Sequence, residues 1–205
     1  MLLKTLLLVL LANAAKCIDD NSTVLTADTL LHLYGSDYKK LAYIDLEKRN
    51  FQKIDANTFE GLVNLEILYL SNNPVGVFAE NTFSDLVNLK RLYAAYNQLN
   101  YVHPYTFANL TSLYYLYFDN HPLNYVDGRI FKKLNKLNFL FFNNNGLRLL
   151  DPGIFSELAN LKQLWLVNNQ LSDLDPAIFS TLTKLKVLQL YGNCLLYTSP
   201  SPRDS

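Results

Sequence analysis

The sequence has no excess of charge, few glycines and no long apolar run, and each shortage argues against a class of protein. The 18 Lys and Arg equal the 18 Asp and Glu, whereas nucleic-acid-binding domains usually carry a basic excess, so we expect no nucleic-acid ligand. Only 7 glycines occur in 205 residues, which leaves little for strained active-site turns. No stretch reaches the roughly 20 apolar residues that span a bilayer, so we expect no transmembrane span in this chain.

Catalytic motifs are also missing. The sequence contains no phosphate-binding loop, no G-x-S-x-G and no H-E-x-x-H. Its three histidines, His32, His103 and His121, do not have metal-ligand spacing with Cys, Asp or Glu. We therefore predict that the chain is not an enzyme and that it needs no cofactor and no metal.

Leucine and aromatic residues, by contrast, are abundant and regularly spaced. Leucines stand 24 residues apart at Leu41, Leu65, Leu89, Leu113, Leu137, Leu161 and Leu185. Phenylalanine repeats with the same period at Phe59, Phe83, Phe107, Phe131, Phe155 and Phe179. Each unit reads L-x-x-L-x-L-x-x-N-x-L-x-x-L, followed by F-x-x-L. A fixed period of this length indicates a repeat architecture.

The pattern resembles the 24-residue repeats of the extracellular leucine-rich-repeat family, as in Toll-type receptor ectodomains, Slit-type proteins and insect leucine-rich immune proteins. The resemblance covers roughly residues 41–195. It implies an α/β solenoid, a leucine-rich-repeat horseshoe with a parallel β-sheet on its concave face and turns or 3₁₀ segments on its convex face. The residues agree, because L-x-L alternates like a strand and one unit cannot bury its apolar edge without neighbours.

An asparagine recurs at the ninth position of the unit. We expect its amide to bond the backbone of its own turn and of the next one, because buried polar groups need partners. The residues of this asparagine ladder are Asn73, Asn97, Asn145, Asn169 and Asn193. Arg49 takes the position in the first unit and His121 in the fourth. We interpret His121 as structural.

The outward positions of the expected strands carry the candidate binding surface. We expect ligand contacts on the concave face from Tyr69, Arg91, Tyr93, Tyr96, Tyr115, Tyr117, Phe139, Phe141 and Trp165. Asp119 and Asn143 are expected on a further outward column. Exposed aromatic patches usually mark interaction sites. Neighbouring aromatics also stabilise a sheet, so a structural role for this surface stays open.

The ends of the chain do not follow the repeat. Residues 1–15 read as a signal peptide, with Lys4, an apolar run and small residues for cleavage. We assign residues 16–40 to an N-terminal cap and residues 41–194 to seven repeats, the last incomplete. Residues 195–205 form a tail that resembles translated adapter sequence and is interpreted as non-native or disordered. We expect the natural protein to continue past residue 194.

Cys17 and Cys194 lie at opposite ends of the expected solenoid. Six strand gaps of about 4.8 Å separate them, and a disulfide needs Cα atoms within about 7 Å. Each cysteine is therefore free, bonded to another chain or without its natural partner, and a dimer stays open. The sequons at Asn21 and Asn109 predict glycosylation.

These features predict an extracellular module, secreted or part of a receptor ectodomain, whose concave face binds a protein or a glycoconjugate. Family resemblance places it in immune recognition or cell-surface signalling. A structural matrix protein with leucine-rich repeats and a secreted inhibitor are the alternatives.

Overall fold

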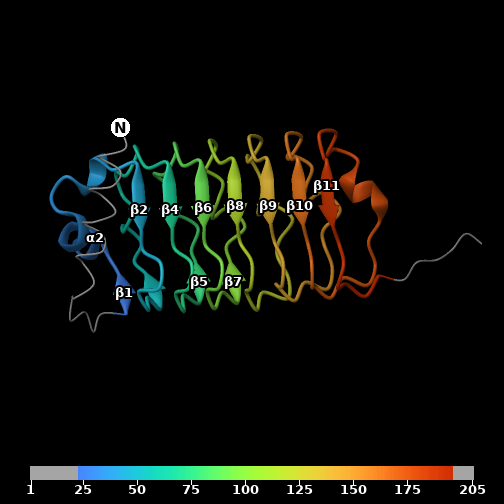
Figure 1. Cartoon of the computed structure of the whole chain (residues 1–205), viewed down its shortest axis with the longest axis horizontal. Coiled ribbons are helices and arrows are strands. Elements are labelled where there is room, and N and C mark those ends of the chain that lie inside the picture. Colours follow the sequence, from blue (N-terminus) through green and yellow to red (C-terminus); the bar gives the residue numbers. More distant parts are fainter. Residues whose placement is uncertain (1–22, 196–205) are drawn as a thin grey trace, which may run out of the picture.

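The computed structural model describes residues 23–195 and shows a parallel-strand solenoid (Figure 1). Its main sheet has seven strands that lie side by side in chain order along the long axis. They are β2 (Tyr43–Asp45), β4 (Ile67–Tyr69), β6 (Arg91–Tyr93), β8 (Tyr115–Tyr117), β9 (Phe139–Phe141), β10 (Gln163–Trp165) and β11 (Val187–Gln189). The predicted fold class is confirmed, with turns in place of helices in most of the repeats.

Each strand pairs with its neighbour at an offset of one repeat, so equivalent residues stack. Leu68 lies opposite Leu92, and Leu164 lies opposite Leu188. The middle residue of each strand points inward, and from Ile44 to Leu164 it is fully buried. The two flanking residues face outward, and we call this outer surface the sheet face. Burial of the leucine columns provides the main favourable free energy of the fold.

The opposite side of the solenoid is built from short strands and turns. β3 (Lys53–Ile54) pairs with β1 (Val24–Leu25), and β5 (Val77–Phe78) pairs with β7 (Tyr101–Val102), below the main sheet in Figure 1. The 3₁₀ segment η2 (Pro176–Phe179) lies between β10 and β11. Buried phenylalanines stack behind the sheet, as in the pair Phe83 and Phe107, whose ring centroids are 6.1 Å apart. They fill the space between the two sides.

A short helical segment precedes the first repeat, within the predicted cap. The helix α2 (Ala27–Tyr34) begins after Thr26, whose hydroxyl accepts a bond from the Thr29 N–H at 3.1 Å. The 3₁₀ segment η1 (Tyr38–Lys40) follows and buries Tyr38. The hydroxyl of Tyr34 donates to the carbonyl of Asp45, which joins this segment to β2. The predicted signal peptide and residues 16–22 lie outside the described residues.

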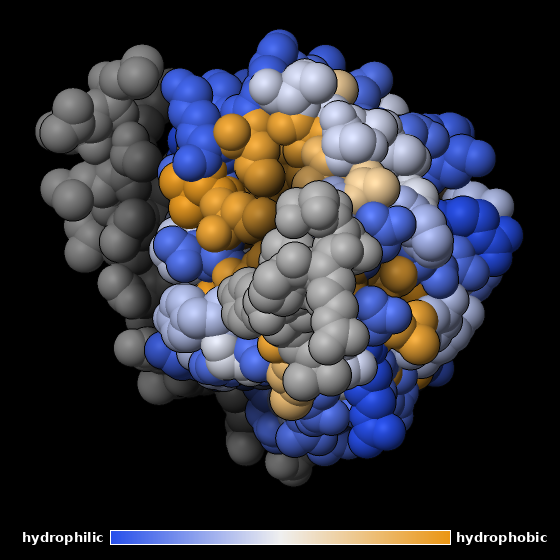
Figure 2. Space-filling view, turned by 90° about the vertical axis from the view of Figure 1, so that its right-hand side faces the viewer, coloured by the Kyte–Doolittle hydropathy of each residue, from blue (hydrophilic) through white to orange (hydrophobic). Residues whose placement is uncertain are grey.

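Hydrophobic residues gather at the C-terminal end of the solenoid (Figure 2). The inward Leu188 of β11 is 36% exposed, whereas the equivalent Leu164 of β10 is fully buried. β11 is the edge strand of the sheet and packs against one neighbour, β10. The core of each repeat is therefore completed by the next repeat, as expected for a solenoid.

The asparagine amides bond the backbone of adjacent turns. Oδ1 of Asn169 accepts from the N–H groups of Asn145 at 3.0 Å and Leu147 at 3.2 Å. Its Nδ2 donates to the carbonyls of Phe142 at 3.0 Å and Leu166 at 3.1 Å. Asn169 is 3% exposed, so water cannot replace these partners. One side chain thus satisfies four backbone groups in two repeats.

Replacing Asn169 with alanine should lower the free energy of unfolding by about 3 kcal/mol or more, because each buried group left without a partner costs about 1–3 kcal/mol. Urea denaturation followed by circular dichroism measures the loss. Asn100→Ala is the matched control, because Asn100 is exposed and only its backbone N–H, which alanine keeps, has a hydrogen bond within the described residues. Equal losses in the two variants would contradict the ladder's role.

Candidate functional site

Five aromatic side chains form a continuous row across the sheet face. We call this row the aromatic stripe, and its residues are Tyr69, Tyr93, Tyr117, Phe141 and Trp165. Successive ring centroids are 4.4, 6.4, 5.6 and 5.5 Å apart. All five residues are half-buried. Contact between neighbouring rings follows directly from strand pairing, because each outward residue has its equivalent on the next strand. Tyr69 and Tyr93 are stacked, as are Phe141 and Trp165, whereas Tyr117 meets both of its neighbours at a steep angle.

Side chains from the neighbouring outward column pack into the stripe. The ring of Tyr115 lies 5.2 Å from Tyr93 and 5.3 Å from Phe141, and 5.9 Å from Phe139. Arg91 and Tyr96 border this layer and are exposed. The structure therefore brings the predicted contact residues together on one surface. Whether they contact a ligand remains a prediction.

The hydroxyls of Tyr115 and Tyr117 are neutral near pH 7. Burial and the neighbouring Tyr93 and Tyr117 raise the pKa of Tyr115 to about 12. Burial, followed by the nearby charge of Asp119, raises the pKa of Tyr117. Each hydroxyl thus keeps its proton and can both donate and accept a hydrogen bond. The layer offers apolar rings with polar tips, a combination common in protein interfaces.

Asp119 and Asn143 do not lie on an outward column, and that expectation was wrong. They are 4% and 9% exposed. The carboxylate of Asp119 accepts from the Asn143 N–H at 2.7 Å and from its amide at 2.9 Å, and Asn143 Oδ1 accepts from the Val167 N–H at 2.7 Å. These side chains bond the backbone just after each strand ends. Burial raises the pKa of Asp119.

Tyr96 has a backbone conformation that tyrosine seldom adopts. Its φ is +55°, in the left-handed region. The equivalent residues in four other repeats are asparagines, which tolerate this region, namely Asn72, Asn120, Asn144 and Asn168. Tyr96 is 53% exposed and has no ring contact within the described residues. A strained, exposed aromatic at the border of the stripe supports a role in binding.

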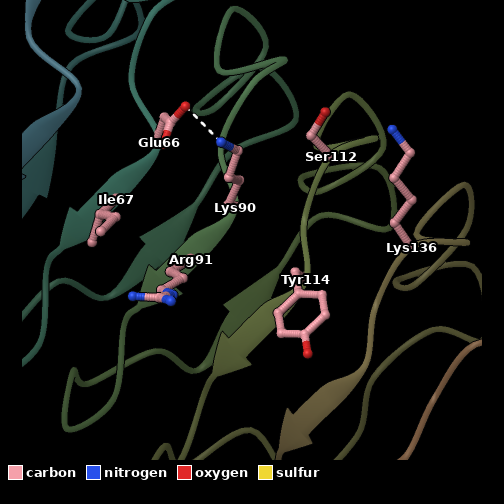
Figure 3. Close-up of a pocket in the computed structure, with 7 residues that line it drawn as sticks. All are labelled: Glu66, Ile67, Lys90, Arg91, Ser112, Tyr114 and Lys136. Atoms are coloured by element: carbon pink, nitrogen blue, oxygen red, sulfur yellow. Dashed lines mark hydrogen bonds and ion pairs between the residues drawn. The ribbon is translucent and has the colours of Figure 1, made fainter.

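A pocket of about 540 Å³ opens at the beginning of β4, β6 and β8, beside the stripe. It is lined by Glu66, Ile67, Lys90, Arg91, Ser112, Tyr114 and Lys136 (Figure 3). Of these residues, only Arg91 was predicted from the sequence. Ile67 begins β4, and the others precede the strands, at positions outside the leucine pattern. Comparing the same position across repeats would have shown that Lys90, Lys162 and Lys186 form one column.

The described residues contain no group of three or more His, Cys, Asp or Glu that could hold a metal ion. His103 lies 3.9 Å from Glu80, and His32 is on α2, so the two are in different parts of the fold. Asn109 is exposed, as the predicted glycosylation requires, and Cys194 is exposed with a free thiol. Asn21 and Cys17 lie outside the described residues.

His121 occupies the ladder position of its repeat but satisfies fewer groups than an asparagine. Its Nδ1 bonds the carbonyl of Asn97 at 3.0 Å, and its ring packs on Phe118 at 4.5 Å. Its Nε2 is buried without a hydrogen-bond partner. Burial lowers the pKa of His121 to about 4, because the charged imidazolium would lose its hydration. The residue is held neutral and is a poor candidate for chemistry.

Two family models match the sequence. The model described as leucine rich repeat matches residues 39–99 and 111–171. A second model, of two leucine-rich-repeat copies, matches residues 159–202. The matched residues contain all seven strands of the main sheet. Among curated proteins, none matches this sequence.

Solved structures with the same fold include two complexes. A crystal structure of the TLR13–ssRNA13 complex has 25% sequence identity and a TM-score of 0.76, and the match covers 83% of this chain and 24% of that one. The Toll–Spatzle complex of Drosophila has 16% identity and a TM-score of 0.59, covering 79% of this chain and 25% of that one. This second likeness shows the fold alone. The chain spans about a quarter of the length of either structure.

Tyr96→Asn should raise the free energy of unfolding by about 1 kcal/mol, because asparagine accepts the left-handed conformation at lower cost. The reverse substitution Asn144→Tyr should lower it by a similar amount. Denaturant titration of both variants beside the parent measures the two shifts. A stability loss in Tyr96→Asn would show that the tyrosine is kept for packing and not for contact with a ligand.

His121 should make the fold sensitive to acid. The unfolded chain takes up this proton near pH 6.5 and the folded chain only near pH 4, so stability is lost progressively as the pH falls from 6.5 to about 4. The total loss is about 3 kcal/mol. An amide at position 121 could accept from the N–H groups of Asn97 and Leu99, as Asn73 does from Arg49 and Phe51.

His121→Asn should therefore gain about 1–2 kcal/mol at pH 7 and should flatten this part of the pH profile. Unfolding free energies of the parent and the variant, measured between pH 4 and pH 8, give the comparison. Identical pH profiles would disprove the assignment of acid sensitivity to His121, since the other titrating groups are common to both proteins.

Proposed function

This chain belongs to the leucine-rich-repeat family, and we propose that the aromatic stripe and its exposed border form its ligand-binding surface. The repeats build a scaffold that is typical of binding and receptor modules, and its similarity to Toll-like receptor structures supports a ligand-binding role in innate immunity. The fold itself does not choose the ligand, because binding specificity lies in the surface residues.

The observation that carries the proposal is the contiguous aromatic layer. Its side chains come from five consecutive strands, and buried leucines hold those strands in register. Tyr, Trp and Arg are the residue types that contribute most to binding energy in interfaces, and all three occur here. Tyr96 adds an exposed ring in a strained conformation that packing does not explain.

We propose an extracellular setting, either as a secreted module or as part of a receptor ectodomain. The apolar leader at residues 1–15, the exposed sequon at Asn109 and the similarity to Toll-like receptor structures support it. In residues 23–195, no helix has the length and hydrophobicity needed to span a bilayer. Catalysis is not part of the proposal.

We favour a protein as the ligand. One matched structure holds single-stranded RNA and the other holds Spatzle, so both classes of partner occur on similar solenoids. Binding of a single strand by stacking needs free ring faces. Here Tyr69 and Tyr93 are stacked on each other at an angle of 2°, and Phe141 and Trp165 at 22°. Stacking covers one face of each of these four rings, so fewer faces are free for bases, whereas ring edges and hydroxyls remain available for contact.

The test is a selection against a yeast-displayed library of secreted and cell-surface proteins. Binders recovered with the parent are measured against Tyr117→Ala/Trp165→Ala and against a control pair, Tyr125→Ala/Leu149→Ala. The control residues are 50% and 52% exposed and lie outside the main sheet. We expect the sheet-face pair to lose affinity by about 30-fold or more, as for one strong hot spot.

The control pair should bind like the parent. Melting temperatures of all variants separate lost contact from lost folding, since removal of stacked rings costs about 0.5–1.5 kcal/mol a pair. Binders that hold the sheet-face variant as tightly as the parent would refute the assignment of this surface.

A further inference from the structure

The residues just before the strands form a row with several positive charges. Each is joined to the next by a backbone bond, as Lys186 N–H donates to the Lys162 carbonyl at 2.8 Å and Tyr114 N–H to the Lys90 carbonyl at 2.9 Å. The row runs along one edge of the sheet face, past the pocket in Figure 3. Lys90, Lys162 and Lys186 belong to this row, and Arg91 and Lys136 lie beside it and line the pocket. We call these five cations the basic rim.

Most of these cations have no anionic partner. Lys90 pairs with Glu66 at 2.6 Å, as Figure 3 shows. Arg91, Lys136, Lys162 and Lys186 have no ion pair and no side-chain hydrogen bond within residues 23–195. Arg91 and Lys136 both line the pocket. Their charges are available to an incoming ligand.

Two carboxylates lie near the rim, Glu66 in the pocket and Asp45 at the end of β2, but none stands at an outward strand position or just before a strand from β6 to β11. Other carboxylates lie on the return turns. Asp127 is bound by Arg129 at 2.7 Å, Asp151 accepts from the Gly128 N–H at 2.6 Å, and Asp175 accepts from the Ala177 N–H at 2.8 Å. All three are on the return turns and not on the sheet face. A net charge of zero therefore conceals a basic edge on the proposed binding surface.

We propose that the basic rim binds an acidic segment of a protein partner, whose apolar side chains contact the aromatic stripe. The inference rests on the proposed function and adds the chemistry of the ligand. Opposite charge on the partner complements the unpaired cations and would speed association. The pocket between Arg91 and Lys136 has apolar walls from Ile67 and Tyr114, so it suits a carboxylate beside an apolar side chain.

The geometry of the stripe favours an acidic protein over a sulfated glycan or a single-stranded RNA. Tyr69 is stacked on Tyr93, and Phe141 is stacked on Trp165. One face of each of these four rings is therefore covered, whereas recognition by stacking needs free ring faces.

The test uses the full chain and four fluorescent probes. They are a 21-residue peptide of repeated Glu-Glu-Leu, the same peptide with Gln for Glu, a heparin oligosaccharide and an oligouridylate. Binding is measured by fluorescence anisotropy at several salt concentrations. The rim variant is Arg91→Glu/Lys136→Glu/Lys162→Glu. Its matched control is Lys53→Glu/Lys132→Glu/Arg148→Glu, three exposed cations outside the rim. Circular dichroism establishes that each variant is folded.

We expect the acidic peptide to bind more tightly than the other three probes, with Kd rising at least tenfold in the rim variant and less than twofold in the control. Added salt should weaken binding to the parent more than binding to the rim variant. Tighter binding of heparin or oligouridylate than of the acidic peptide would overturn the inference, and so would equal losses in the rim and control variants.

The sheet-face pair Tyr117→Ala/Trp165→Ala separates the two proposals. If it loses the acidic peptide while the rim variant keeps it, the inference about charge fails and the binding surface stands. If the rim variant loses the peptide while the sheet-face pair binds like the parent, the aromatic stripe does not contact this ligand. The proposed binding surface then fails for this ligand, and so does the proposal that acidic and apolar side chains of one ligand contact the rim and the stripe together.

Discussion

Hydrogen bonding by buried asparagine amides is the interaction on which the rest of the structure depends. A chain that turns once every 24 residues around a dry core leaves backbone N–H and C=O groups at every turn. The ladder amides satisfy these groups in pairs of adjacent repeats, as Asn169 does for Asn145, Leu147, Phe142 and Leu166. Because each amide joins two repeats, it also fixes their offset. Together with the buried leucine columns, the ladder therefore holds the strands in register.

A fixed scaffold leaves the outward residues free to vary. Leu68, Leu92 and Leu116 keep the strands in place whatever side chains stand beside them. The sheet face can therefore carry rings at five consecutive strands without disturbing the core. The same regularity places charged residues that precede the strands in one row, so the equivalent lysines Lys90, Lys162 and Lys186 lie along one edge of the sheet. Specificity on such a surface comes from columns of residues and not from a single cleft.

The sequence predicts the repeat well and its departures poorly. The 24-residue period identifies Leu65 or Phe83 as buried, because only a stacked unit can bury both columns. It also places Tyr93 and Tyr117 together, since equivalent outward positions must be neighbours. It fails for Asp119 and Asn143, because alternation alone assigns them outward, whereas the strand has already ended and their side chains turn to the backbone of the next repeat. The basic rim was not predicted because the net charge of the chain does not show where the charged residues lie on the surface.

Three local departures lie close together, between the third and fourth repeats. Tyr96 is strained, and its N–H donates to the carbonyl of Asp119, a buried carboxylate with a raised pKa. His121 follows two residues later, with an unpartnered Nε2 where an asparagine would bond fully. Each costs stability that a regular repeat would keep. Departures from local rules are expected to accumulate at functional sites, where they are offset by stability gained elsewhere. Their position beside Tyr115 and Tyr117 is therefore an independent reason to centre the proposed binding surface on β6 and β8, where the rings, the pocket and Arg91 meet.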